Sequence, residues 1–333
     1  MGKRLLAETS RVFEMKYDIY FHGNCFDGAA SAATLSHFLK LRGDSYGKFI
    51  PLTHPVNKKW WRKLKMKSPS AVVDITYHPR AKIWFDHHPT TFIDKRWEKD
   101  FKASDIKLLT SNFKILDTKS PSCTGLIFRH FTKNFEIKAP KHIKELAKWA
   151  DIIDRARFKN AREAMGFQQA ALRIAKSFVD KKPSLSYAKL LIKALSEKSM
   201  IFIDKLKPVR IRFLKHKRDF KKSMPEIKKH LVLRGKVTIL YGMNKRLAGA
   251  RFASYYFYPQ SKYSVRILKR GNKHVLSVGQ NPWNPPRHPR IGQYLEKKYG
   301  GGGHSVAGSA AFTKKNDALR EALNIADYLN KHV

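Results

Sequence analysis

The chain has only two cysteines, Cys25 and Cys123, among its 333 residues. Two thiols cannot build the several bridges that hold small secreted domains together, so a disulfide framework is excluded and a reducing cytoplasm is expected. Long apolar runs are lacking as well. Residues 1–8 contain no apolar core of the kind a signal peptide needs, and no stretch is long enough to cross a membrane. We therefore expect a cytoplasmic protein without a membrane partner.

Acidic residues are scarce too. Asp and Glu number 26 against 68 Lys and Arg, which leaves a formal net charge of +42. Residues 201–300 hold 25 basic and 4 acidic residues, and the basic side chains are densest from Lys205 to Lys229. Such a field attracts polyanions and speeds their encounter with the protein. A basic bias common to the whole proteome would give the same composition, so charge favours a nucleic-acid partner without establishing one.

The most informative feature that is present is a set of short apolar runs, each ending in acidic or imidazole side chains. The runs are 17–21 followed by His22, 71–73 followed by Asp74, and 82–85 followed by Asp86, His87 and His88. Each is typical of a short buried strand. An Ala-rich helical segment, 28–39, follows the first run, and helical patterns dominate 141–204. Strand then helix, repeated, predicts a parallel sheet whose strand ends share one crevice.

The second half has a different pattern. Its strand-like runs are 237–241, 263–267 and 274–279, and residues 319–329 are typical of an amphipathic closing helix. The glycines 300–303 favour neither helix nor strand and allow backbone amides to crowd around an anion. We expect a phosphate cradle there, with a flexible hinge as the alternative. Arg266 is a candidate phosphate clamp, and Trp283 either stacks on a base or packs against nearby prolines.

Five motifs together resemble those of the DHH phosphoesterases and their DHHA1 domain. They are HGNCFDG (22–28), VVD (72–74), DHHPT (86–90), WAD (149–151) and GGGH (301–304). The resemblance implies an α/β fold: a parallel-sheet DHH domain with flanking helices, a helical linker, and a smaller α/β DHHA1 domain with a mixed sheet. We place the DHH domain at 1–204, the basic linker at 205–230 and the DHHA1 domain at 231–333.

The resemblance also implies two divalent ions, usually manganese, with magnesium or cobalt as alternatives. The implied ligands are His22 on one ion, Asp27, His87 and Asp151 on the other, and Asp74 as the bridge. Asp86 and His88 are implied as catalytic residues, the first by fixing a ring nitrogen of a neighbouring histidine and the second by facing the substrate phosphate. The implied substrate-binding residues are Arg266, Gly301, Gly302, Gly303 and His304.

Two places in these motifs leave alternatives open. Many family members have an aspartate two residues after the first histidine, where this chain has Asn24. Beside it, Cys25 is either a soft ligand that would favour zinc or iron, or a small buried neutral thiol, which is the expected state. Asp154 lies one helical turn after Asp151, as a reserve ligand or as an ion-pair partner of Arg155.

The function implied is a metal-dependent phosphodiesterase or exonuclease. Its substrates would be short RNA or DNA oligonucleotides or linear dinucleotides, hydrolysed by a water that two ions activate. A second copy of the chain, in a homodimer, is a further implied partner. The alternatives are a phosphatase acting on bisphosphorylated nucleotides, a cyclic-dinucleotide phosphodiesterase, and a basic nucleic-acid-binding protein with a degenerate site.

Overall fold

The computed structural model describes residues 14–53, 56–103, 113–178, 184–243, 247–286 and 290–333. The chain divides into two compact units. The first runs to Arg157 and resumes with Gln169–Arg212, and the second comprises Phe158–Gln168 and Phe213–Val333. Residues 158–168, which the sequence analysis assigned to the DHH domain, therefore pack with the second unit.

The first unit is built on a parallel sheet of five strands. Across the sheet the order is β2 (Ser45–Leu52), β1 (Lys16–His22), β3 (Ser70–Val73), β4 (Ile83–Asp86) and β5 (Phe113–Leu116). All four neighbouring pairs run parallel. The central strands β3 and β4 are buried at every position because both faces of the sheet are covered. The predicted parallel α/β sheet is confirmed.

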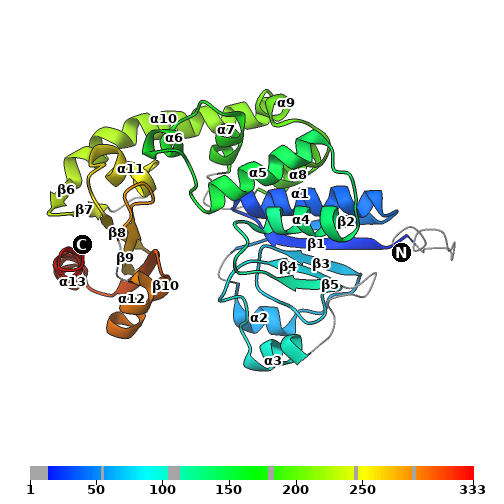
Figure 1. Cartoon of the computed structure of the whole chain (residues 1–333), viewed down its shortest axis with the longest axis horizontal. Helices are drawn as coiled ribbons and strands as arrows, with labels where there is room; N and C mark the ends of the chain where they lie inside the picture. The colour runs from blue at the N-terminus through cyan, green and yellow to red at the C-terminus, as the bar shows by residue number, and fades with distance from the viewer. Residues whose placement is uncertain (1–13, 54–55, 104–112, 179–183, 244–246, 287–289) are drawn as a thin grey trace. The chain divides into compact units, whose positions relative to one another are not determined.

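Helices cover the two faces of this sheet unequally (Figure 1). The larger layer contains α1 (Phe26–Leu41), α4 (Cys123–Asn134), α5 (Lys141–Asp154), α7 (Ala170–Ser177), α8 (Leu185–Glu197) and α9 (Met200–Asp204). The opposite face carries α2 (Lys58–Lys63) and α3 (Lys95–Ala103). Phe21 and Phe85 are buried under the larger layer, whereas Trp84 and Trp61 are buried on the other side. Alternating strand residues thus supply two separate cores.

The start of α1 lies unusually close to the end of β1. A Cβ atom on Gly28 would stand 2.2 Å from the backbone oxygen of His22, so only glycine fits at this helical position. Gly125 has the same role in α4, where a Cβ would stand 2.2 Å from Asp151 Oδ1. Gly28 thus lets α1 approach the end of β1, and Gly125 lets α4 approach the Asp151 side chain on α5.

The second unit contains a mixed sheet of six strands. Their order is β10 (Gly302–His304), β11 (Ala307–Phe312), β9 (Lys273–Gln280), β8 (Tyr263–Arg270), β7 (Val237–Met243) and β6 (Leu231–Arg234). The β7–β8 pair is parallel and the other pairs are antiparallel. The helices are α6 (Ala161–Met165), α11 (Ala250–Phe257), α12 (Ile291–Tyr299) and α13 (Lys315–Asn330). The predicted smaller α/β domain with a mixed sheet is confirmed.

The glycine run differs from its prediction. Gly302 and Gly303 lie in β10 and pair with β11, so the expectation that consecutive glycines avoid strand structure was wrong. Pairing succeeds because the partner backbone comes very close: a Cβ on Gly303 would stand 2.4 Å from Ala307 O. Gly303 also has φ 144°, a conformation that favours glycine. Glycine at these positions allows β10 to pair closely with β11 at the edge of the sheet, and it leaves the backbone amides of β10 uncovered by side chains.

A long helix, α10 (Lys207–His230), passes from the first unit into the second after Arg212. The segment proposed as the linker, 205–230, consists mostly of this helix. Many of its basic side chains are exposed: Lys207, Arg210, Lys215, Lys217, Arg218, Lys221, Lys222, Lys228 and Lys229. None of the helices in the described residues is long and apolar enough to cross a membrane. Residues 1–8, considered above for a signal peptide, lie outside the described ranges.

The contact at Gly28 gives a first prediction. Gly28→Ala should lower the free energy of unfolding of the first unit by about 1–3 kcal/mol, because the new methyl group overlaps the His22 carbonyl and α1 must shift. Urea denaturation followed by circular dichroism measures this. The control is Gly302→Ala, which places a methyl group in open space. Equal stability of Gly28→Ala and the parent protein would contradict the close contact.

Candidate metal centre and substrate site

The strand register aligns three functional side chains at one edge of the parallel sheet. Phe21 of β1 is paired with Val73 of β3, and Val73 with Phe85 of β4. The residues that follow are His22, Asp74 and Asp86, so all three leave the sheet at the same level. Asp74 has φ 56°, a left-handed conformation that is uncommon outside glycine and frequent at functional sites.

Around Asp74 the structure brings together metal-ligating atoms from several elements. Three groups have their ligand atoms within 4.8 Å of one another: His22, Cys25 and Asp74; Asp74, His87 and His88; and Asp27, His87 and Asp154. His87 Nε2 lies 3.5 Å from Asp74 Oδ1, 3.8 Å from Asp27 Oδ2 and 3.6 Å from Asp154 Oδ2. His22 Nδ1 lies 3.5 Å from Asp74 Oδ2. Asp74 therefore joins two adjacent ligand groups.

These separations fit a cation better than hydrogen bonds. Hydrogen bonds weaken beyond about 3.2 Å, whereas two ligand atoms that each lie about 2.1 Å from a shared ion are roughly 3–3.5 Å apart. Asp74 is 2% exposed, and neither of its carboxylate oxygens has a hydrogen-bond partner in the described residues. A buried carboxylate without donors is costly unless a cation compensates its charge. The residues present fit divalent metal ions.

The pKa shifts within the cluster also indicate a site for positive charge. Burial, Asp74 and Asp154 raise the pKa of Asp27 well above its usual range. Burial alone would lower the pKa of His87, but its contacts with Asp74, Asp27 and Asp154 outweigh this and raise the pKa to about 10. Burial would likewise raise the pKa of Asp74, yet the neighbouring histidines hold it below its ordinary value. The buried carboxylates are therefore stable only when positive charge compensates them, and either protons or metal ions can supply it.

Hydrogen bonds to backbone groups orient two of the ligand side chains. His87 Nδ1 lies 3.2 Å from the carbonyl oxygen of Ser120, so the ring donates there and leaves Nε2 directed at the carboxylates. Asp27 accepts hydrogen bonds at the start of α4, from the backbone nitrogens of Cys123 at 2.8 Å and Thr124 at 3.0 Å. The positive end of the α4 dipole holds this carboxylate in place.

The Asp86 carboxylate contacts the two histidines that follow it and Thr91. Its side chain is fully buried and accepts hydrogen bonds from the backbone nitrogen of His87 at 2.8 Å and from Thr91 Oγ1. His88 Nδ1 lies 2.7 Å from Asp86 Oδ1. Burial would lower the pKa of His88, but Asp86 raises it to about 9. The expectation that Asp86 fixes a neighbouring ring applies to His88, since Ser120 orients His87.

The structure replaces Asp151 with Asp154 in the ligand cluster. Asp151 accepts a hydrogen bond from Ser122 Oγ at 2.6 Å and pairs with Arg129 at 3.1 Å. Asp154, one turn later on α5, reaches His87. Arg155, the alternative partner considered for Asp154, donates to the carbonyl oxygens of Thr118 and Ser120. The WAD motif lies on the helix that reaches the cluster, and Asp154 rather than Asp151 is the carboxylate beside His87.

The first ligand group contains Cys25 and does not contain its neighbour Asn24, the residue that departs from the family pattern. Asn24 is exposed to solvent, and Cys25 lies with His22 and Asp74. The spacing in the sequence is the signal for this ligand: Cys25 immediately precedes α1 and lies two positions before Asp27. One short turn therefore delivers ligands to both groups.

In the second unit, Arg266 is partly buried and forms no ion pair with the acidic residues that the structure describes. Its Nη2 donates to Ser277 Oγ at 2.9 Å, while Nε is buried and makes no hydrogen bond to the described residues. Burial lowers the pKa of Arg266 to about 10, and Arg251 and Arg270 add positive charge nearby. Such a site attracts an anion. Gly301 and the β10 glycines lie on the same sheet, but the side chain of His304 lies outside what the structure describes.

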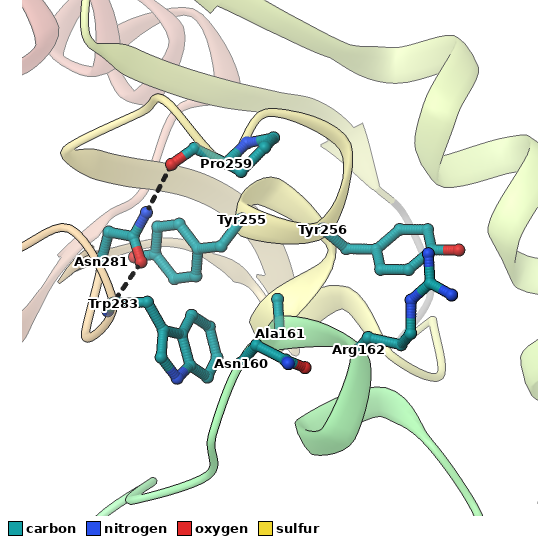
Figure 2. A pocket seen from close by; sticks show the side chains of 8 residues that line it. All are labelled: Asn160, Ala161, Arg162, Tyr255, Tyr256, Pro259, Asn281 and Trp283. Carbon is teal, nitrogen blue, oxygen red and sulfur yellow. Dashed lines mark hydrogen bonds between the residues drawn. The ribbon is translucent and has the colours of Figure 1, made fainter.

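The same unit has an aromatic hollow of about 440 Å³. Figure 2 shows its lining, which comprises Asn160, Ala161, Arg162, Tyr255, Tyr256, Pro259, Asn281 and Trp283. Trp283 is held rigidly, because Nε1 donates to Phe158 O at 2.7 Å and the ring contacts those of Phe252 and Tyr255. The Tyr255 hydroxyl donates to Gly279 O at 2.9 Å. The rings therefore form a fixed wall, and Trp283 packs on aromatic neighbours.

Comparison with solved structures identifies the fold. The pGpG-specific phosphodiesterase PggH from Vibrio cholerae matches with a TM-score of 0.69 and 19% identity, over 95% of this chain and 100% of that chain. The RecJ exonuclease bound to manganese matches at 0.54 and 13%, over 94% of this chain and 90% of that chain. RecJ from Thermus thermophilus, in complex with Mn²⁺, matches at 0.55 and 13%, over 94% of this chain and 52% of that chain.

The chain has the DHH/DHHA1 fold. Neither a family model nor a curated protein sequence matches it. At identities of 13–19% the shared DHH/DHHA1 architecture establishes the fold, while activity must be argued from the residues of this chain.

The two aspartates of α5 make the metal centre testable. Asp154→Asn should weaken Mn²⁺ binding by at least about tenfold, because a neutral amide replaces a carboxylate beside His87. Asp151→Asn is the matched control on the same helix and should keep Mn²⁺ affinity while weakening the contact with Arg129. Isothermal titration of metal-free protein with Mn²⁺ measures both. Loss of affinity in Asp151→Asn alone would restore Asp151 as the ligand.

Proposed function

We propose that this chain is a metal-dependent phosphodiesterase acting on short oligonucleotides or linear dinucleotides. The observation that carries the proposal is the set of three overlapping ligand groups at the sheet edge, two of which share Asp74 and two of which share His87. Two ions held about 3.5–4 Å apart are a recurrent device for phosphoester hydrolysis. The solved structures with the same fold include a pGpG-specific phosphodiesterase and a manganese-bound exonuclease, which supports phosphoester chemistry and manganese.

The ligands proposed here divide between two ions. His22 and Asp74 would hold the first, and Asp27, Asp74, His87 and Asp154 would hold the second. When bound, such ions withdraw charge from phosphate oxygens and lower the pKa of a coordinated water. The DHH cluster contributes a preorganised set of donors whose orientation is fixed by Ser120 and by the start of α4. No protein nucleophile is required.

His88 has the position and charge to bind the phosphate. Asp86 holds a proton on its Nδ1 side, so an imidazolium lies next to the carboxylate cluster. A protonated imidazole can donate to an anionic phosphate oxygen and balance charge as it develops there. Asp86 acts through His88, by keeping the ring charged and fixing its orientation.

The second unit is proposed to hold the rest of the substrate. Arg266 would bind a terminal phosphate through its Nε–H group, which makes no hydrogen bond to the described residues. The glycine run lies three strands away in the same sheet, with β11 and β9 between β10 and β8, and is proposed as a separate backbone contact for the substrate. The aromatic hollow has the volume and flat walls that suit a nucleobase, and Tyr255 adjoins both Arg266 and the hollow. One phosphate clamp and one base-sized hollow favour short substrates over long strands.

The decisive experiment is hydrolysis of a length ladder of 5′-labelled RNA and DNA, from dinucleotide to twenty-mer, with Mn²⁺ and with a chelator. Preference for the shortest members would support the proposed function. Processive shortening of long strands would indicate an exonuclease instead. Release of phosphate from a bisphosphorylated nucleotide, or opening of a cyclic dinucleotide, would indicate those alternatives, and metal-independent binding without products a degenerate binder.

In the same assay, Asp74→Ala should lower kcat by at least about 100-fold, because the carboxylate shared by both ligand groups is lost. Binding of a noncleavable oligonucleotide, measured by fluorescence anisotropy at low salt, should change little, since the exposed basic side chains remain. Loss of both hydrolysis and binding would show that Asp74 is needed for both.

A further substitution tests the phosphate clamp. Arg266→Gln should raise KM for a 5′-phosphorylated dinucleotide by about 10-fold or more, with a smaller effect on kcat, because a charge-assisted contact away from the reacting bond is removed. Lys269→Gln, an exposed position on the opposite face of the same strand, also removes one positive charge and is the control. If both variants behave alike, general charge rather than a clamp accounts for binding.

A further inference from the structure

We propose that Cys25 is a thiolate ligand of the first metal ion, beside His22 and Asp74. The inference rests on the proposed two-ion centre and specifies its composition. The first site would then have one sulfur, one nitrogen and one oxygen donor, whereas the second would have one imidazole and only carboxylates otherwise. Thiolate favours zinc, cobalt and iron over magnesium and manganese. The two ion positions would therefore differ in metal preference.

Geometry supports this role for Cys25. Its sulfur, a ring nitrogen of His22 and an oxygen of Asp74 all lie within 4.8 Å of one another. Asp74 supplies an independent pointer, because it is 98% buried and both oxygens lack hydrogen-bond partners among the described residues. A cation placed among these three residues would satisfy a carboxylate that the protein leaves without donors.

The local structure around Cys25 is arranged for ligation rather than for helix capping. Cys25 is the N-cap residue of α1, with extended backbone dihedrals of φ −123° and ψ 144°. Oxygen-bearing side chains are preferred at that position because they accept a hydrogen bond from the first turn, yet the Cys25 side chain makes no capping hydrogen bond. Placement beside His22 is assured by Gly28, whose missing Cβ lets α1 start against the end of β1.

The second cysteine shows what an ordinary buried thiol looks like in this protein. Cys123 is completely buried, its Sγ donates to Phe85 O at 3.2 Å, and it belongs to the main hydrophobic core. Cys25, in contrast, is partly exposed and lies outside that core. Burial and the carboxylates of Asp74, Asp154 and Asp27 raise the pKa of the Cys25 thiol, so a bound cation would be needed to stabilise the thiolate.

Cobalt substitution provides a readout that does not depend on activity. Metal-free full-length protein titrated with Co²⁺ should develop a near-ultraviolet thiolate-to-cobalt charge-transfer band. The band should be absent in Cys25→Ser and retained in Cys123→Ser, with circular dichroism confirming that both variants fold. Zn²⁺ should also protect Cys25 from iodoacetamide in the parent protein, measured by peptide mass spectrometry.

A second experiment compares the affinities of the first site for Zn²⁺ and Mn²⁺. Cys25→Asp should lower the affinity of the first site for Zn²⁺ relative to Mn²⁺ by at least about tenfold, because a hard carboxylate replaces a soft thiolate. Two bound Co²⁺ ions without a charge-transfer band would overturn the role of Cys25 and leave the two-ion centre standing. Failure of the parent protein to bind Co²⁺, Zn²⁺ or Mn²⁺ would overturn the proposed function as well.

Discussion

The central constraint in this protein is the burial of several carboxylates at one sheet edge. Asp27 and Asp74 are almost inaccessible, Asp154 lies within 3.6 Å of the same His87 nitrogen, and no lysine or arginine pairs with Asp74 in the described residues. Their mutual repulsion is tolerable only if positive charge, from protons or from metal ions, compensates it. The parallel strands, the closely seated α1 and the start of α4 can all be understood as the means of holding this charge in place.

Most of the fold was predictable because it follows from periodicity that is local in sequence. The apolar runs before His22, Asp74 and Asp86 each form a strand, and parallel pairing places their ends in one row. Burial on both faces removes the need for polar alternation, which explains why these short runs stand out. In the second unit the apolar runs 237–241, 263–267 and 274–279 lie in β7, β8 and β9, whereas the mixed sheet was implied by the family resemblance.

Other features of the structure depend on tertiary contacts, which local sequence patterns do not encode. Asp151 and Asp154 are one helical turn apart, and only the rotation of α5 against Arg129 and His87 distinguishes them. Residues 158–168 pack with the second unit through long-range contacts, such as that of Phe158 with Trp283, which no local pattern encodes. The strand at Gly302–His304 exists because β11 offers a backbone close enough to pair with glycines.

The charge distribution links ion binding to substrate binding. With a net charge of +42 the protein attracts phosphates everywhere, but the carboxylate cluster would repel them at the one place where hydrolysis is proposed. Bound divalent ions reverse the local sign there while leaving the exposed side chains of α10 unaffected. Nonspecific attraction should then be independent of metal, and productive binding should require it. A basic surface alone would bring polyanions to the protein without selecting where they are cut.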